Sequence, residues 1–361
     1  MDLFRLVMDT REEIKQPNVV AVLRQGNVES LLLARTLEAR VPFKFGYLTL
    51  WRPRIRSLDV LHEGFIGTVT DDGALAAVKA LLQELDRGKA DRLGLGLQRE
   101  GTPLMTAVRQ IPGWFSRDFA PVTALHRAME LPQAPGEFLR RMKSKHRSWL
   151  KAKTRDLDAK FNRSVRYAMF SRPEDIAKVM VDVEAVAAKT YLRGLGTGFR
   201  NDVEHIRRFE MEAKAGRLRI CILYGADVPQ AFWIGFVYGN TFHSGYTGYD
   251  AAMREFEVGT LVFVYLIDRL CEENVKIFDF GLGDAFYKQR FADQCWNEVS
   301  ISIYRPSLRG AGLKLAFTVH YHFVRFLHSV LKRLKLVDWV KRTWRAKKTQ
   351  PSKERGNGTQ V

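Results

Sequence analysis

The stretch VKIFDFGLGDAFYKQRF, residues 275–291, joins a short apolar strand to two glycines and a polar loop. The run Val275–Phe280 is rich in aromatic and β-branched residues, which is typical of a buried strand. Beyond the glycines, Asp284, Tyr287 and Lys288 bring a carboxylate, a phenol and an ammonium group to one backbone opening. We therefore predict that these three side chains take part in catalysis. The alternative is a loop that is simply rich in solvated polar groups.

The residues before this strand predict a helix, and before that helix an antiparallel meander. Leu261–Leu270 is an apolar helix that follows the turn at residues 257–260. Upstream of the helix, alternating apolar residues bounded by Gly, Asn and Pro predict three strands: Arg217–Tyr224, Gln230–Tyr238 and Thr241–Tyr249. Still earlier, the patterns predict a strand at Val165–Phe170 and helices at Pro173–Lys189 and Asp202–Ala215.

With that order of elements, residues 136–304 resemble the acetyltransferase domain of the GNAT superfamily. The resemblance is to the branch related to FemAB peptidyl transferases and found in polysaccharide biosynthesis, including the cellulose-biosynthesis-associated type. Its most specific part is the string Asp-Phe-Gly-x-Gly-Asp-x-x-Tyr-Lys at residues 279–288. The family implies direct attack of an acceptor on a thioester, with Asp284 as base, Tyr287 as acid and Lys288 as partner of a phosphate or oxyanion.

The resemblance also implies acetyl-CoA or another acyl-CoA as co-substrate. Its pyrophosphate would bind at the start of the helix after the meander, where main-chain N–H groups and the helix dipole favour an anion. The family pattern places this site at Arg254, Val258, Gly259 and Thr260. Glu257 stands where the family usually has glycine, so an ordinary helix start is the alternative.

Four further residues are candidates for contacting the acceptor substrate. His243 and Tyr246 lie on the strand before the helix expected to bind the cofactor, although aromatic residues in strands are more often packed in a core. Asp279 alternates with two phenylalanines, so its carboxylate should face the opposite side of the strand from their rings, either to contact a substrate or as a buried, hydrogen-bonded structural group. Arg193 lies in a loop with three glycines that could cover an acceptor or serve only as a connector.

The N-terminal third repeats part of this pattern. Residues 66–97 and 247–282 each run from a strand end through a turn and a helix to a strand with a Gly-x-Gly ending, which suggests a duplicated domain or a chance recurrence of a common motif. Other N-terminal elements are predicted as follows: strands at 18–24, 43–51, 59–67, 91–97 and 121–131, helices at 73–86 and 103–111, and either type at 28–39.

The predicted fold class is α/β (α+β), with tandem GNAT-like domains, each a mixed, mostly antiparallel sheet flanked by helices, and a basic C-terminal helix. The expected domains are a degenerate GNAT-like domain at residues 1–134, an acetyltransferase-like domain at 135–308 and a basic helix with a disordered tail at 309–361. A long basic helix at Pro135–Phe161 should open the second domain.

Positive charge is concentrated in two segments of a chain whose net charge is +18. Leu139–Arg166 holds 11 Lys and Arg against two Asp, and Arg309–Val361 holds 13 against two acids. Such segments point to a phosphate-rich cofactor, an anionic membrane or nucleic acid. The stripe of apolar residues in Phe323–Trp344 resembles a helix that lies on anionic lipid, or one that packs on the protein with its basic face in solvent.

The three cysteines are far apart and lie in or beside apolar runs, so neither a disulfide framework nor a metal site is expected. The N-terminus does not resemble a signal peptide, and no apolar run reaches 18 residues. We therefore expect a cytoplasmic protein, with membrane contact limited to the periphery of its inner face.

Three functions remain open from the sequence. The leading hypothesis is a coenzyme A-dependent N- or O-acyltransferase that acts on a sugar or a cell-envelope or polysaccharide precursor. The second is a FemAB-like aminoacyl transferase that uses aminoacyl-tRNA. The third is a non-catalytic scaffold that binds a membrane or nucleic acid through the basic segments. Saturable coenzyme A binding favours the first, whereas salt-sensitive RNA binding favours the other two.

Overall fold

A computed structural model describes residues 2–45, 48–111, 113, 115–118, 121–190, 193 and 198–333. The chain forms two compact units, neither of which is continuous in sequence. Unit 1 comprises Met1–Pro17, Gly96–Met105 and Val122–Ser300, and unit 2 comprises Asn18–Leu95, Thr106–Pro121 and the segment from Ile301 onward. This division differs from the contiguous ranges expected above. The reason lies in residues 122–130, which pair with strands formed by residues 277–282 and 294–300 rather than with the N-terminal residues.

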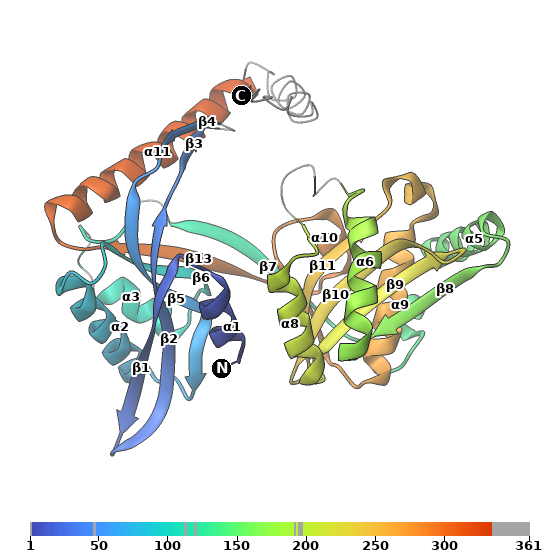
Figure 1. The fold of residues 1–361 in the computed structure, drawn as a ribbon, viewed down its shortest axis with the longest axis horizontal. Helices are drawn as coiled ribbons and strands as arrows, with labels where there is room; N and C mark the ends of the chain where they lie inside the picture. Colours follow the sequence, from blue (N-terminus) through green and yellow to red (C-terminus); the bar gives the residue numbers. More distant parts are fainter. Residues whose placement is uncertain are drawn as a thin grey trace, which may run out of the picture. The chain divides into compact units, whose positions relative to one another are not determined.

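Unit 1 is built on a mixed, mostly antiparallel sheet (Figure 1). Its strands are β7 (Val122–Glu130), β8 (Val165–Phe170), β9 (Leu218–Gly225), β10 (Val228–Tyr238), β11 (Thr241–Tyr249), β12 (Ile277–Leu282) and β13 (Gln294–Tyr304) up to Ser300. They lie in the order β13-β7-β12-β11-β10-β9-β8, and β11 and β12 form a parallel pair. The strands β8 to β12 agree with those predicted from the sequence.

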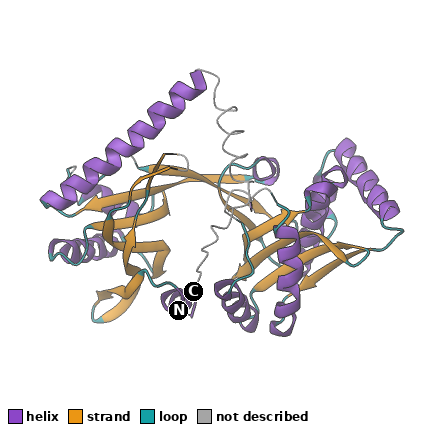
Figure 2. Cartoon of the chain, turned by 45° about the horizontal axis from the view of Figure 1, so that its top comes forward, coloured by secondary structure: helices purple, strands orange, loops and turns teal. Residues whose placement is uncertain are grey.

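Helices cover both faces of this sheet (Figures 1 and 2). One face packs on α6 (Ile176–Ala187) and α8 (Val203–Lys214), through a core that includes Val183, Phe209 and Phe232. The other face packs on α9 (Val258–Glu272), through a core that includes Phe263 and Phe278. The other helices described in unit 1 are α1 (Asp2–Thr10), α4 (Glu137–Arg141), α5 (Ser144–Lys160), the 3₁₀ turns η1 (Pro173–Asp175) and η2 (Ala251–Phe256), and α10 (Phe286–Phe291).

The single long helix predicted at Pro135–Phe161 is wrong, because the chain breaks it into α4 and α5. Met142 between them has an extended backbone, with φ −71° and ψ 150°. The guanidinium of Arg147 donates hydrogen bonds to the carbonyl oxygens of Arg140 and Met142, at 3.1 and 3.4 Å. These bonds satisfy acceptors that a continuous helix would have used, so a side chain from α5 stabilises the break.

Unit 2 contains the strands β1 (Ile14–Arg24), β2 (Asn27–Arg40), β5 (Arg54–Gly67) and the first part of β6 (Arg92–Arg99), which are neighbours in that order. The strands β2 and β5 pair antiparallel, whereas β5 and β6 pair in parallel. Residues 28–39, which the sequence left open between helix and strand, therefore lie in a strand. Its other elements are α2 (Asp71–Asp86), α3 (Pro103–Gln110), which straddles the unit boundary, the short hairpin β3 (Phe43–Phe45) and β4 (Leu48–Trp51), and α11 (Leu308–Arg333).

Each unit contains a strand, helix and parallel strand in succession. In unit 2, β5 and β6 pair in parallel from Ser57 with Arg92 to Val60 with Leu95, and α2 connects them. In unit 1, β11 and β12 pair in parallel, and η2 and α9 connect them. The predicted fold class, a mixed and mostly antiparallel sheet flanked by helices, is confirmed.

The end of the predicted amphipathic helix, residues 334–344, and the tail at 347–361 lie outside the described residues. Among the helices that the structure describes, none is both long and apolar enough to cross a bilayer.

Candidate active site

The parallel pairing of β11 and β12 is short and ends at one pair of residues. It runs through Thr241 with Ile277, Phe242 with Phe278, and His243 with Asp279. Beyond that last pair, β11 and β12 are no longer paired with each other. Because successive side chains alternate between faces, the two phenylalanines enter the core under α9, while the imidazole and the carboxylate lie on the other face.

His243 and Asp279 form a hydrogen-bonded pair on that face. The Nδ1 atom of His243 lies 3.0 Å from Oδ2 of Asp279. A carboxylate only accepts hydrogen bonds, so a neutral imidazole in this position carries its proton on Nδ1 and a lone pair on Nε2. Nε2 has no hydrogen-bond partner among the described residues, and the His243 side chain is 41% exposed. This arrangement suits a general base.

A second histidine lies behind the carboxylate. Nε2 of His126, on β7, lies 2.5 Å from Oδ1 of Asp279, and its Nδ1 lies 2.7 Å from Oε1 of Glu298 on β13. The ring of Trp296 stacks on His126 at a centroid distance of 4.4 Å, and its indole N–H donates to Glu298 at 3.1 Å. His126 and Glu298 are buried, with side-chain exposures of 6% and 1%. The carboxylate that orients His243 is therefore held in one position.

The charges of this network shift the pKa values of its members in opposite directions. Burial alone would raise the pKa of Asp279, but hydrogen bonds from His126, His243 and the Gly281 N–H bring it well below its ordinary value. Burial alone would lower the pKa of His126, yet the carboxylates of Asp279 and Glu298 raise it. Asp279 is thus ionised at neutral pH, as a residue that orients a general base must be.

The raised pKa of His126 predicts that stability falls as pH rises. Protonated His126 stabilises the folded state fully below its unfolded pKa of about 6.5, and this contribution is lost as pH rises through the higher folded value. Urea unfolding of the wild type and of His126→Gln should therefore give a difference in unfolding free energy that shrinks as pH rises above about 6.5. The depressed pKa of Asp279 changes the free energy of unfolding only at lower pH, outside this range. A difference that stays constant over this range would contradict the assignment.

A second Asp-His pair supports Tyr246 on the same face of β11. Oδ1 of Asp202, at the start of α8, lies 2.7 Å from Nδ1 of His205, and Nε2 of that histidine lies 2.8 Å from the Tyr246 hydroxyl. By the tautomer argument used above, the Tyr246 O–H donates to His205. The phenolic oxygen then retains lone pairs that can accept a further hydrogen bond. The substrate-binding role of Tyr246 stays a prediction.

The residues of the predicted catalytic string do not share one environment. The prediction of an open polar loop is wrong at Tyr287 and Lys288, which lie on the short helix α10. The Tyr287 ring packs on the α9 side of the sheet, 5.7 Å from that of Trp233 between centroids. Asp284 is exposed and pairs with Arg127 of β7 at 2.7 Å, which lowers its pKa. A carboxylate so paired is a weak base, so the structure favours His243 for that role.

Lys288 is buried rather than open to solvent. Its ammonium group donates to the carbonyl oxygens of Phe280 and Leu282, each at 2.6 Å, and burial lowers its pKa. These bonds hold the end of β12 and leave one of the three ammonium protons for another acceptor. The catalytic role of Lys288 therefore stays a prediction. If Lys288 has this role, Lys288→Met lowers turnover by at least ~10-fold.

A structural effect of Lys288 is expected whether or not it is catalytic. Lys288→Met should lower the unfolding free energy by about 1–3 kcal/mol, because two carbonyl oxygens lose their buried donor. Gln289→Met, at the exposed neighbouring position, is the matched control and should change stability by less than ~0.5 kcal/mol. Chemical denaturation measures both. Equal stability of the two variants would mean that the carbonyl contacts contribute nothing.

The start of α9 carries a carboxylate where the family resemblance implies a pyrophosphate. Glu257 has a left-handed backbone with φ 55°, and its side chain accepts a hydrogen bond from the Thr260 hydroxyl at 2.9 Å. Val258 is fully buried, and a side chain added at Gly259 would meet the Tyr249 ring. The fourth predicted residue, Arg254, is exposed. A conventional coenzyme A site here would have to displace or neutralise Glu257.

Arg193 is held within the protein in the structure. Its guanidinium pairs with Glu184 of α6 and donates to the carbonyl oxygen of Phe199 at 3.0 Å. To contact an acceptor as predicted, Arg193 would therefore have to give up its bonds to Glu184 and to the Phe199 carbonyl.

His126 and Glu298 were not found by sequence reasoning. Both lie in strands that carry several other polar residues, and His126 is 153 positions from Asp279 in the sequence. No sequence pattern distinguished them from their polar neighbours Arg127 and Asn297.

The hydrogen-bonded imidazole and carboxylate thus lie at the end of a parallel strand pair, in a mixed sheet flanked by helices. Residues 144–289 match the family model described as "Acetyltransferase (GNAT) domain". The fold is therefore GNAT-like, and the protein is acyltransferase-like. No curated protein matches the chain in sequence.

Three solved structures are among those similar to this chain. The C-terminal DUF2156 domain of a candidate lysylphosphatidylglycerol synthetase from Agrobacterium fabrum is 11% identical, with 87% of this chain and 89% of that chain covered and a TM-score of 0.51. FemX is 11% identical, with coverages of 83% and 90% and a TM-score of 0.52. A tandem GNAT protein of the clavulanic acid pathway is 10% identical, with coverages of 84% and 88% and a TM-score of 0.47.

Proposed function

We propose that the protein transfers an acyl group to an amine or hydroxyl, with His243 as the general base. The observation that carries this proposal is the exposed imidazole whose Nδ1 is fixed by Asp279 and whose Nε2 is unpartnered among the described residues. An acceptor of the sugar or cell-envelope precursor class follows from the resemblance to polysaccharide-biosynthesis acetyltransferases.

The reaction requires one proton transfer and one exchange of bonds at the acyl carbon. Nε2 of His243 takes a proton from the acceptor as the new C–N or C–O bond forms. The bond from the acyl carbon to sulfur then breaks, and the thiolate leaves with the electron pair. Asp279 stabilises the imidazolium that forms, as a carboxylate beside a cation does.

Acetyl-CoA or another acyl-CoA is the proposed donor, and an aminoacyl-tRNA is the alternative. One observation favours the alternative: the Glu257 carboxylate at the start of α9 would repel a pyrophosphate. The basic helix α5 could contact the phosphates of a tRNA instead. In that case the bond that breaks joins the acyl carbon to a ribose oxygen.

Peripheral attachment to an anionic membrane is proposed for the C-terminal helix. In its described part, α11 exposes Leu315, Val319, Phe323 and Phe326, with exposed fractions from 47% to 66%. Apolar side chains of this size beside Arg325 are typical of a helix at a lipid surface. Sedimentation with vesicles that contain anionic lipid, compared with neutral vesicles, tests this attachment.

A thermal-shift screen tests the donor class. Acetyl-CoA, longer acyl-CoAs and aminoacylated tRNA are each added to the full chain, and a ligand present at 100 times its dissociation constant should add ~2.7 kcal/mol of stability. Stabilisation by an acyl-CoA supports the first donor, and stabilisation by the charged tRNA supports the second. No effect of any of them, together with no transfer to a panel of amines and hydroxyls, would overturn the proposed function.

A further inference from the structure

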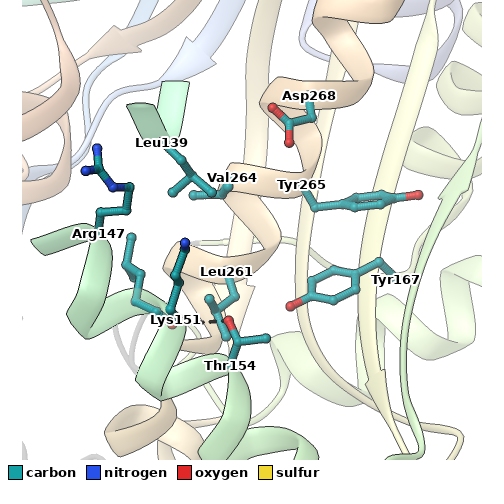
Figure 3. Close-up of a pocket in the computed structure, with 10 residues that line it drawn as sticks. Leu139, Arg147, Lys151, Thr154, Tyr167, Leu261, Val264, Tyr265 and Asp268 are labelled. Atoms are coloured by element: carbon teal, nitrogen blue, oxygen red, sulfur yellow. Dashed lines mark hydrogen bonds between the residues drawn. The ribbon is translucent and has the colours of Figure 1, made fainter. Parts of the chain in front are cut away.

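A cavity of about 200 Å³ lies on the opposite side of the unit 1 sheet from His243. It is formed by α4, α5, α9 and β8 (Figure 3). Leu150 of α5 and Leu261 of α9 belong to the core that contains Phe278, whereas His243 faces the other side of its strand. The cavity is therefore separate from the candidate active site.

One wall of this cavity is cationic. Arg147 and Lys151 are spaced by four residues on α5, so both line the cavity from the same side of that helix. Lys151 has no ion pair among the described residues. Arg147 uses one of its nitrogens to bond main-chain carbonyls, which leaves guanidinium protons for a ligand. Two positive charges at one wall favour an anionic group.

The opposite wall provides an uncommitted phenol. The rings of Tyr167 and Tyr265 stack with centroids 5.0 Å apart. In Figure 3 the Tyr167 hydroxyl points toward α5 and Thr154, whereas that of Tyr265 points away. The Tyr167 hydroxyl has no hydrogen-bond partner among the described residues. Burial raises the pKa of Tyr167, so its hydroxyl stays protonated. It is thus a donor directed at the cavity and at the side that carries Lys151.

The remaining lining limits the ligand to a small molecule with one negative charge. Leu261 and Val264 of α9 supply an apolar floor, and Asp268 places a carboxylate at the rim. That carboxylate would repel a second negative charge, which disfavours phosphorylated ligands. An apolar cavity of about 150 Å³ accepts benzene, so this one has room for a single ring or a short branched chain with a carboxylate.

We propose that this cavity binds a small organic acid, with one carboxylate held by Lys151, Arg147 and Tyr167 and an apolar body that lies on Leu261 and Val264. The proposal concerns binding and does not depend on the acyltransferase activity. It assigns a second ligand site to the unit that holds the candidate active site.

Calorimetric titration of the full chain with benzoate tests the proposal. Benzoate should bind saturably with a roughly millimolar dissociation constant, and benzyl alcohol, benzylamine and phenyl phosphate should each bind at least ~10-fold more weakly, a difference of ~1.4 kcal/mol. Equal binding of benzyl alcohol would show an apolar cavity without anion selectivity and would overturn the proposal, as would no binding of benzoate.

Variants on α5 locate the binding. Lys151→Met should weaken benzoate binding by about tenfold, whereas the matched control Lys153→Met, on the same helix but outside the cavity lining, should leave it unchanged. Tyr167→Phe removes only the hydroxyl and should also weaken binding. Equal losses in the two lysine variants would mean that benzoate responds to the general charge of α5, which would overturn the assignment to this cavity.

Discussion

Replacement of His243 by glutamine is expected to lower the rate of acyl transfer by about 10²- to 10⁴-fold, the usual contribution of a positioned general base. Glutamine is close to histidine in size and can still hydrogen-bond Asp279, but its amide cannot take a proton at neutral pH. The variant should therefore fold normally and bind the donor with unchanged affinity. Steady-state kinetics with the donor and acceptor found by screening measure the loss.

His322→Gln is the matched control for this experiment, because that histidine lies on the exposed surface of α11. It should retain full activity. If His243→Gln also retained full activity, the base would have to be sought elsewhere, and Asp284 would return as the candidate. A loss of donor binding in His243→Gln would point to a binding role instead.

Replacement of Phe263 by alanine is expected to reduce the unfolding free energy by about 3–5 kcal/mol, as is usual for a buried phenylalanine. Phe263 is 1% exposed and lies at the centre of the core between α9 and the sheet. Its ring lies within 5.9 Å, between centroids, of those of Phe138, Trp233, Phe278, Phe280 and Phe291. The cavity left by alanine would remove these contacts together.

Phe286→Ala provides the comparison, since that ring is 77% exposed at the start of α10. Its removal should change stability by no more than ~0.5 kcal/mol. Guanidinium unfolding of both variants measures the difference. A loss below ~1 kcal/mol for Phe263→Ala would mean that the core collapses around the smaller side chain.

Much of the fold follows from local patterns. The strands β8 to β12 and the helices α2, α6, α8 and α9 have strong apolar periodicity and clear starts, such as Asp202, whose carboxylate caps α8 in the structure. The break between α4 and α5 was missed because a helical pattern of apolar residues runs through it. A contact from Arg147 to carbonyl oxygens stabilises that break, and such a contact leaves no trace in periodicity.

The candidate site was predicted in part. His243, Tyr246 and Asp279 were identified as substrate-binding candidates, and the alternation of Asp279 with two phenylalanines correctly placed its carboxylate away from the core. The catalytic emphasis on Tyr287 and Lys288 came from the family string, and the structure places these residues in packing and main-chain contacts. Their catalytic roles stay predictions.

The sequence by itself determined the order of the elements in the acetyltransferase-like region, the class of fold and the strand end where an acidic residue faces away from the core. These features depend on short-range periodicity and on turn residues, whose effects extend over about the length of one helix or strand. Only the tertiary structure decided which side chains meet at that strand end. His126, His243, Asp279 and Glu298 lie on four different strands, and their contacts depend on how β7 inserts between β12 and β13. Long-range register of this kind is set by packing of the whole sheet and is not encoded in any local stretch.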